Sequence, residues 1–273
     1  MGLPKEYRRI VLGIEYHGTR YHGWQRQKRD PVPTVQWALE KALSKIAATE
    51  IKTVCAGRTD AGVHATAQVV HFDTAVQHED KAWIYGVNTH LPDDISVRWV
   101  VETDDSFHAR FSATARRYRY LIFNHSSKHA LFHDTVSWCY RPLDLERMQQ
   151  AAQYLEGEHD FSSFRAAACQ AKNPVRNLEF VRLYRSGALI VLDVQANAFL
   201  QHMVRNIAGV LIDIGSGKHQ PEWAREVLEA RDRRDGAVTA SAKGLYLVAV
   251  EYPQKFQLPV TSPGPFLVAD PSN

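Results

Sequence analysis

The chain has 273 residues, 45% of them hydrophobic, so it can bury a sizeable core in one large domain or two smaller ones. Its formal net charge is only +3, so any attraction to nucleic acid must come from local clusters of charge rather than from the total. The cysteines Cys55, Cys139 and Cys169 lie far apart without the two-residue spacing of zinc or redox motifs, which argues against a metal site and against structural disulfides.

The N-terminal part starts with charged residues and a short apolar run. Residues 10–14 are apolar, but Glu15 follows directly, and this run is too short for a signal peptide or a membrane span. We therefore expect a cytoplasmic protein without a membrane contact.

The first half of the chain has the pattern strand, helix, two strands, helix, strand. Alternation of β-branched and aromatic residues predicts strands near residues 8–16, 52–56, 67–73 and 95–104. Apolar residues at helical spacing (Val35, Leu39, Leu43 and Ile46) predict a helix from Val35 to Ala47 with Thr34 as its N-cap. A second helical segment is expected over residues 79–88.

The second half repeats this order. Strands are expected near residues 116–124, 178–185, 188–196 and 245–252, and helices over residues 144–155, 199–214 and 221–230. Each half fits a split βαβ, ferredoxin-like unit, so we predict an α+β protein whose two halves form a continuous antiparallel sheet with helices on one face. The expected boundaries are 1–112 for the N-terminal half, 113–252 for the C-terminal half, and 253–273 for an extended, proline-rich C-terminal segment.

The sequence GRTDAGVH at residues 57–64 places one carboxylate, Asp60, between two glycines. Gly57 and Gly62 suit a tight turn that brings Asp60 close to a bulky substrate, and Arg58 could keep the carboxylate ionised. An ionised, positioned aspartate can serve as a nucleophile or a base. The alternative is an ordinary turn with a surface ion pair.

A basic and aromatic segment lies between residues 107 and 120. It contains Arg110, Arg116, Arg117 and Arg119 together with Phe111, Tyr118 and Tyr120, and it has no acidic residue. Because basic groups bind phosphates and aromatic rings stack on bases, this mixture favours RNA binding. The alternative is an edge strand whose arginines are merely solvated.

These segments and several others resemble the tRNA pseudouridine synthase A family, which isomerises uridines 38 to 40 of the tRNA anticodon arm. The matching residues stand in the family's order at 57–72, 107–113, 116–120, 160–165, 197–199, 203–206 and 244–247. The resemblance implies the pseudouridine synthase fold, an active site between the two halves, and an isomerase that needs no metal, nucleotide, flavin or other cofactor.

The resemblance also implies roles for single residues. Asp60 would be catalytic, and Arg58 would help to hold the target nucleotide out of its stack. Tyr118 would pack against the flipped base, Leu245 would support that tyrosine, and Arg205 would pair with the aspartate. By pattern alone, Arg205 is typical of a surface residue whose aliphatic stem is buried. Tyr118 is typical of strand packing, and Leu245 of a core position.

Contacts with tRNA are implied for two stretches and one histidine. The residues are Phe107, His108, Ala109, Arg110, Phe111, Ala168, Cys169, Gln170, Ala171, Lys172 and His78. The family acts as a homodimer on tRNA, and the resemblance implies the same partners here, namely the anticodon stem-loop and a second copy of the chain.

Three other interpretations remain open. The chain could be a pseudouridine synthase that acts at another RNA position, or a non-catalytic RNA-binding module built on the same kind of sheet. It could also be a hydrolase that uses Asp60 with His64 or another histidine, with or without a metal. The presence of Asp60, Arg58, Tyr118 and Arg205 together argues against the non-catalytic module.

Overall fold

The computed structural model describes residues 7–27 and 32–268, and the chain forms two compact units. Unit 1 comprises Met1–Thr114 and Leu247–Pro265, and unit 2 comprises Ala115–Tyr246 and Phe266–Asn273. Strand β10 (Leu245–Glu251) spans the boundary between them. The ends of the expected domains, residues 1–6 and 269–273, lie outside the described part. Within that part, no helix is long and apolar enough to cross a membrane.

The sheet of unit 1 is built around strand β1 (Arg8–Tyr16). This strand pairs antiparallel with β3 (His64–Thr74) on one side and with β4 (Ile95–Thr103) on the other. The short strand β2 (Val54–Cys55) also pairs with β3. The predicted strands are confirmed, although β3 begins earlier than expected, at His64, directly after the glycine-flanked turn.

Helix α1 (Val35–Ala47) confirms the predicted helix and its cap. The side chain of Thr34 accepts a hydrogen bond from the backbone N–H of Trp37, and Val35, Leu39 and Leu43 are fully buried. The second predicted helix forms as well, but its middle is a π-helical turn, Ala82–Gly86, which sequence periodicity does not distinguish from an α-helix.

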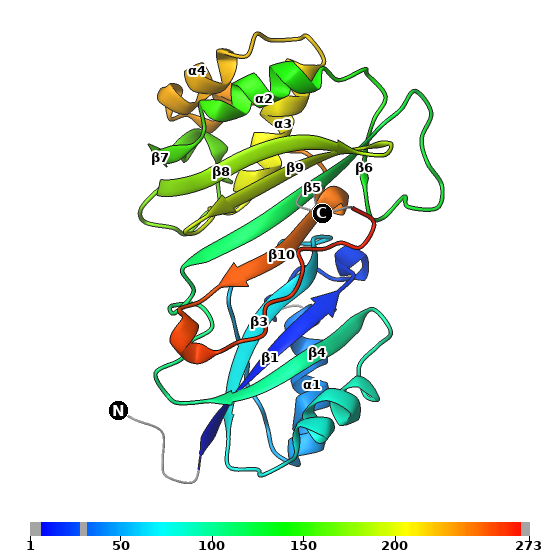
Figure 1. The fold of residues 1–273 in the computed structure, drawn as a ribbon, viewed down its shortest axis with the longest axis vertical. Coiled ribbons are helices and arrows are strands. Elements are labelled where there is room, and N and C mark those ends of the chain that lie inside the picture. Colours follow the sequence, from blue (N-terminus) through cyan, green and yellow to red (C-terminus); the bar gives the residue numbers. More distant parts are fainter. Residues whose placement is uncertain (1–6, 28–31, 269–273) are drawn as a thin grey trace. The chain divides into compact units, whose positions relative to one another are not determined.

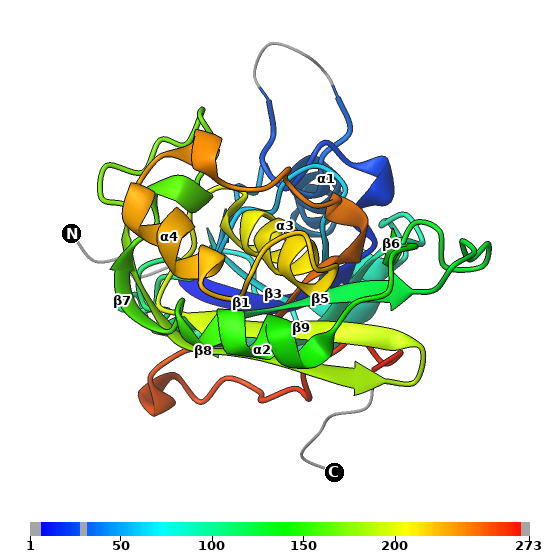
Figure 2. The ribbon, with the colours of Figure 1, turned by 90° about the horizontal axis from the view of Figure 1, so that it is seen from above.

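The opposite face of this sheet is covered by the C-terminal segment. Figures 1 and 2 show α1 on one face of unit 1 and the chain after Tyr252 on the other. There, Phe256 is buried in a cluster with Val11, Val69 and Phe107. The C-terminal segment expected to be extended therefore packs against unit 1 up to Pro265 and includes a short 3-10 turn, Gln254–Phe256.

The sheet of unit 2 has the strand order β5-β9-β8-β7, and all of these neighbours are antiparallel. Its long strands confirm the prediction, whereas two short strands were not predicted. The strands are β5 (Ala115–Asn124), β8 (Val175–Ser186), β9 (Leu189–Ala196), and the short β6 (Ser137–Cys139) and β7 (Gly157–Asp160). Strand β6 pairs parallel with the end of β5.

The described part of unit 2 contains three α-helices that lie close together (Figure 1), namely α2 (Leu145–Gln153), α3 (Met203–Gly215) and α4 (Trp223–Ala230). Helix α3 starts at Met203 rather than at residue 199, because His202 adopts the left-handed conformation with φ of 64° and interrupts the helical pattern. Both units thus combine helices with mostly antiparallel strands, which confirms the predicted α+β class.

Candidate active site

The Asp60 loop, defined as residues 56–63, connects strands β2 and β3. The backbone N–H of Ala56 donates to the Val69 carbonyl at 2.8 Å, and that of Val63 donates to the Asp60 carbonyl at 3.2 Å. Gly62 has a φ of 77°, a conformation that residues with a side chain rarely adopt. The turn predicted between the two glycines is therefore present, and it needs glycine at position 62.

Buried polar side chains fix the base of the Asp60 loop. The Thr59 hydroxyl and the Tyr16 phenol lie 2.8 Å apart, in hydrogen-bond contact. The amide of Gln68 donates to the Gly57 carbonyl at 2.6 Å and to the Tyr16 hydroxyl at 3.4 Å. Because these groups are shielded from water, each requires its partner, and together they hold the residues around Asp60 in one conformation.

The segment that follows β1 clamps the same loop through its backbone. The N–H of Trp24 donates to the Thr59 carbonyl at 3.0 Å, and the N–H of Gly62 donates to the Tyr21 carbonyl at 3.2 Å. A Cβ atom at Gly23 would lie 2.7 Å from the Thr59 carbonyl oxygen, so only glycine permits this approach. The Asp60 loop is therefore preorganised on a rigid part of unit 1.

Asp60 itself is half-buried, and its neighbour Arg58 is exposed. The effect of Arg58 on the charge of this carboxylate stays a prediction. His64 is buried, and its Nδ1 accepts a hydrogen bond of 3.0 Å from the Gly18 N–H. That bond assigns Nδ1 a structural role and weakens the hydrolase interpretation that uses His64 as a base.

Tyr118, Arg205 and Leu245 belong to unit 2. Tyr118 lies on β5 opposite Val194, is largely buried, and its ring meets Phe199 edge-on at 5.0 Å between centroids. Leu245 is buried at the start of β10, in agreement with the core position that its pattern indicates.

Arg205 lies in the first turn of α3 and is half-buried. Its Nε donates to the Ala240 carbonyl at 2.8 Å, while the Ala240 N–H donates to the Arg205 carbonyl at 3.1 Å. These bonds hold the backbone and the guanidinium of Arg205, so Arg205 is an anchored residue of unit 2 rather than a freely solvated one.

The arginines of strand β5 do not form the RNA-binding cluster predicted from the sequence. Arg117 makes two bonds of 2.7 Å to the carboxylate of Asp193, and Arg119 donates to the same carboxylate at 2.9 Å. The side chains of Arg119 and Asp193 are 0% and 2% exposed. A buried acidic partner on strand β9 thus accounts for these two charges, and Arg116, also buried, donates to the Asn197 carbonyl.

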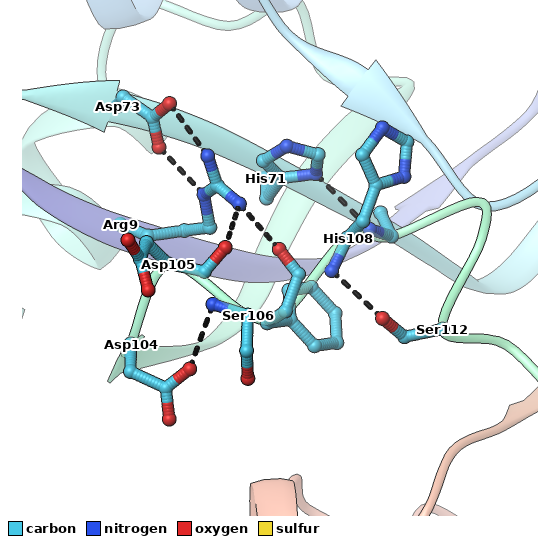
Figure 3. A network of polar contacts seen from close by, with 10 residues as sticks. Arg9, His71, Asp73, Asp104, Asp105, Ser106, His108 and Ser112 are labelled. Carbon is cyan, nitrogen blue, oxygen red and sulfur yellow. Dashed lines mark hydrogen bonds and ion pairs between the residues drawn. The ribbon is translucent and has the colours of Figure 1, made fainter. Parts of the chain in front are cut away.

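The stretch 107–111 divides into buried anchors and exposed side chains. Phe107 and Ala109 are fully buried, so their side chains are not available to a ligand. Arg110 is exposed and Phe111 is 75% exposed, with the His108 ring stacked on Phe111 at 4.3 Å. Figure 3 shows the hydrogen bonds that hold this stretch.

The remaining predicted RNA contacts lie on the surface of their units. In unit 1, His78 is exposed, and its Nε2 lies 3.0 Å from the Ile46 carbonyl at the end of α1. In unit 2, Ala168, Gln170 and Lys172 are exposed, whereas Cys169 and Ala171 are half-buried.

Sequence reasoning missed the supporting residues Gln68 and Arg9. Gln68 is a fully buried amide on strand β3, and Arg9 is a cation in the first strand of the sheet. A polar residue within a strand expected to be buried was the available signal, because such a group requires hydrogen-bond partners.

The chain is similar to known proteins over most of its length. A family model described as tRNA pseudouridine synthase matches residues 13–112 and 151–253. The tRNA pseudouridine synthase A of Pseudomonas aeruginosa is 60% identical over 96% of this chain and 91% of its own length. The corresponding proteins of Coxiella burnetii and Alcanivorax borkumensis are 55% and 56% identical, over 95% and 96% of this chain and 99% and 98% of their own.

Proposed function

Because the chain belongs to the tRNA pseudouridine synthase family, we propose that it isomerises uridines 38, 39 and 40 of the tRNA anticodon arm with Asp60 as the catalytic residue. Family membership makes the protein an isomerase that acts on tRNA. The observation that supports the catalytic role of Asp60 is the preorganised loop that presents its half-buried carboxylate.

The reaction places modest demands on the protein. The bond from N1 to C1′ breaks, the uracil turns, a bond from C5 to C1′ forms, and the proton on C5 is lost while N1 gains one. Atoms and electrons balance without an oxidant or a reductant. A single carboxylate held in a fixed position can act on the sugar or the base, because orientation lowers the entropic part of the barrier.

The target base must leave its stack before a carboxylate can reach it. We propose that Arg58 and Arg205 contact the extruded nucleotide, that Tyr118 packs against the base, and that Leu245 supports Tyr118. The exposure of Arg58, the anchoring of Arg205, and the burial of Leu245 at the start of β10 support these roles. An aromatic ring against the base offsets part of the free energy lost on unstacking.

The body of the tRNA requires contacts of its own. We propose that the exposed Arg110 and Phe111 contact it, with His78 and Lys172 as further contacts. In the first stretch, residues 107–111, Phe107 and Ala109 serve as buried anchors. The second stretch, residues 168–172, lies around Cys169 and supplies the other contact. The enzyme would act as a homodimer in the cytoplasm, as the family resemblance implies, and the anticodon stem-loop is the expected part of the substrate.

The test uses a tRNA transcript with uridines at positions 38 to 40, incubated with the protein or with Asp60→Asn. Pseudouridine is then mapped by carbodiimide-dependent stops of primer extension. Stops at these positions with the wild type and none with the variant are the expected result. Stops elsewhere would reassign the substrate position, and tRNA binding without stops from either protein would favour a non-catalytic module.

A further inference from the structure

We infer that Arg9 is a positioning residue that holds the RNA-contact loop, defined as residues 104–112, in its binding conformation. The inference rests on the proposed function, because it assumes that the exposed part of this loop contacts tRNA. Arg9 stands on strand β1, and within the described part of the chain its guanidinium bonds go to Asp73 and to the RNA-contact loop rather than to the Asp60 loop. Its importance follows from the bonds that its guanidinium makes (Figure 3).

The guanidinium of Arg9 joins the sheet to the RNA-contact loop. Its Nε and Nη2 donate to the two carboxylate oxygens of Asp73 on strand β3, at 2.7 and 2.8 Å. Its Nη1 donates to the carbonyls of Asp105 and Phe107, at 2.8 and 2.6 Å. The Arg9 side chain is only 13% exposed, and its bonds to Asp73 and to the Phe107 carbonyl are partly buried.

Other bonds fix the loop next to this point. The Ala109 N–H donates to Nδ1 of the buried His71 at 3.1 Å, and the hydroxyl of Tyr252 donates to the Ala109 carbonyl at 2.6 Å. Phe107 fills the core between Tyr252 and Phe256, with ring centroids 5.0 Å from each. Arg9 holds the entry of the loop, and these contacts hold its middle.

The exposed end of the loop depends on this support. Nδ1 of His108 accepts the N–H groups of Arg110 and Phe111, at 3.2 and 3.1 Å. The His108 ring also stacks under Phe111, and the Arg110 guanidinium lies 5.5 Å from the Phe111 ring centroid. An exposed ring backed by an imidazole and flanked by a cation suits an unpaired base and its phosphate.

Arginine is suited to this task for a geometric reason. The planar guanidinium binds a carboxylate with two donors and retains others for the two carbonyls, whereas a lysine ammonium is a point charge without that fork. Arg9 thus acts through the loop and not on the substrate. Its loss should weaken tRNA binding and leave the chemical step nearly unchanged.

The experiment measures kcat and KM for tRNA isomerisation, and tRNA affinity by anisotropy, for wild type, Arg9→Gln and Arg9→Lys. Arg8→Gln is the matched control, because Arg8 is the adjacent arginine of β1 and pairs with Glu102 instead. We expect both Arg9 variants to raise KM and the dissociation constant about fivefold to tenfold with kcat within about twofold, and Arg8→Gln to match the wild type. The lysine variant keeps a charge beside Asp73 and provides a folded protein if the glutamine variant unfolds.

A double-mutant cycle with Phe111→Ala separates positioning from general destabilisation. If Arg9 acts through the loop, Arg9→Lys should add little to the rise in KM that Phe111→Ala already causes. Additive losses, an unchanged KM in both folded Arg9 variants, or a fall in kcat alone would overturn the inference. Absence of isomerisation by the wild type would instead count against the proposed function, while the binding measurements would still test Arg9.

Discussion

The Tyr16 hydroxyl and the Thr59 hydroxyl lie 2.8 Å apart and link the end of strand β1 to the residue that precedes Asp60. Both side chains are buried, and Gln68 bonds the same phenol and the Gly57 carbonyl. The position of Asp60 therefore depends on these buried side chains. This dependence can be measured.

Replacing Tyr16 by Phe should lower stability and activity together. The variant keeps the ring but leaves the Thr59 hydroxyl and the Gln68 amide without the phenol, which should cost about 1–2 kcal/mol of unfolding free energy. Because a small displacement of a reacting group is costly, kcat should fall about tenfold or more. Urea unfolding and single-turnover kinetics check both effects. Tyr85→Phe, at an exposed tyrosine, is the control, and equal effects from both variants would contradict the assignment.

The stability of unit 1 should fall in mild acid because of His71. Burial, with smaller effects from Arg9 and His108, lowers the pKa of His71 to about 4, while Asp73 opposes the shift. In the unfolded chain the pKa is about 6.5. Between these values the unfolded state binds more protons, so the stabilisation is complete above pH 6.5 and is lost as the pH falls toward 4. Protonation would also replace the lone pair that accepts the Ala109 N–H.

Urea midpoints between pH 7 and pH 4.5 test this effect, with His71→Gln as the comparison. The variant lacks the titrating group, so its midpoint should depend less on pH over this range than that of the wild type. Equal slopes for the two proteins would show that other groups cause the acid sensitivity. The pKa of His108 is also lowered, mainly by burial, so some pH dependence should remain in the variant.

The local features of the fold could be predicted from the sequence, and the long-range pairings could not. Thr34 as N-cap, the buried stripe of α1 and the left-handed Gly62 follow from short-range rules, and all are present. The β5 arginines were misinterpreted because their partner Asp193 is 74 residues from Arg119 along the chain. Strand pairing decides which charges meet, and a single sequence does not reveal that pairing.

The same limit applies to the site. The glycines and the carboxylate of residues 57–62 indicated a reactive loop. A polar residue in a buried strand shows that Gln68 and Arg9 need partners, but it does not reveal which groups they bond. Arg9 is 64 residues from Asp73 and 98 from Phe107. Likewise, the proline content after Tyr252 predicted an extended segment, whereas the buried ring of Phe256 attaches that segment to unit 1.

Truncation of Phe256 should destabilise unit 1. Its ring lies in the cluster with Phe107, and removing a buried phenylalanine side chain costs about 3 kcal/mol or more. Phe266→Ala is the matched control, since Phe266 is 92% exposed and its loss should change stability by less than about 0.5 kcal/mol. Chemical denaturation distinguishes the two variants. A Phe256→Ala protein as stable as the control would show that the C-terminal segment is not part of the core.

The salt dependence of tRNA binding should distinguish the exposed Arg110 from the paired arginines of strand β5. Arg110→Ala should reduce the slope of log affinity against log salt by about 1, because one phosphate contact is lost. Arg117→Gln should leave the slope unchanged, since Arg117 is paired with Asp193. The reverse pattern would restore the β5 arginines as RNA contacts.

Asp193→Asn should act on stability instead of on binding. It leaves Arg119 buried beside a neutral side chain, and breaking such a pair from one side costs about 3–5 kcal/mol. Urea unfolding provides the measurement, with Asp232→Asn, at a surface pair with Arg234, as the control. A loss of stability no larger than that of the control would contradict a structural role for Asp193.

Release of tritium from tRNA labelled at C5 of uridine tests the central role of Asp60 most directly, because the C5 hydrogen leaves only when C5 bonds to C1′. Wild type and Asp60→Asn are compared at equal tRNA occupancy, established by a parallel binding measurement. We predict release by the wild type and background release by the variant. Undiminished release by a folded, tRNA-bound Asp60→Asn protein would contradict the account.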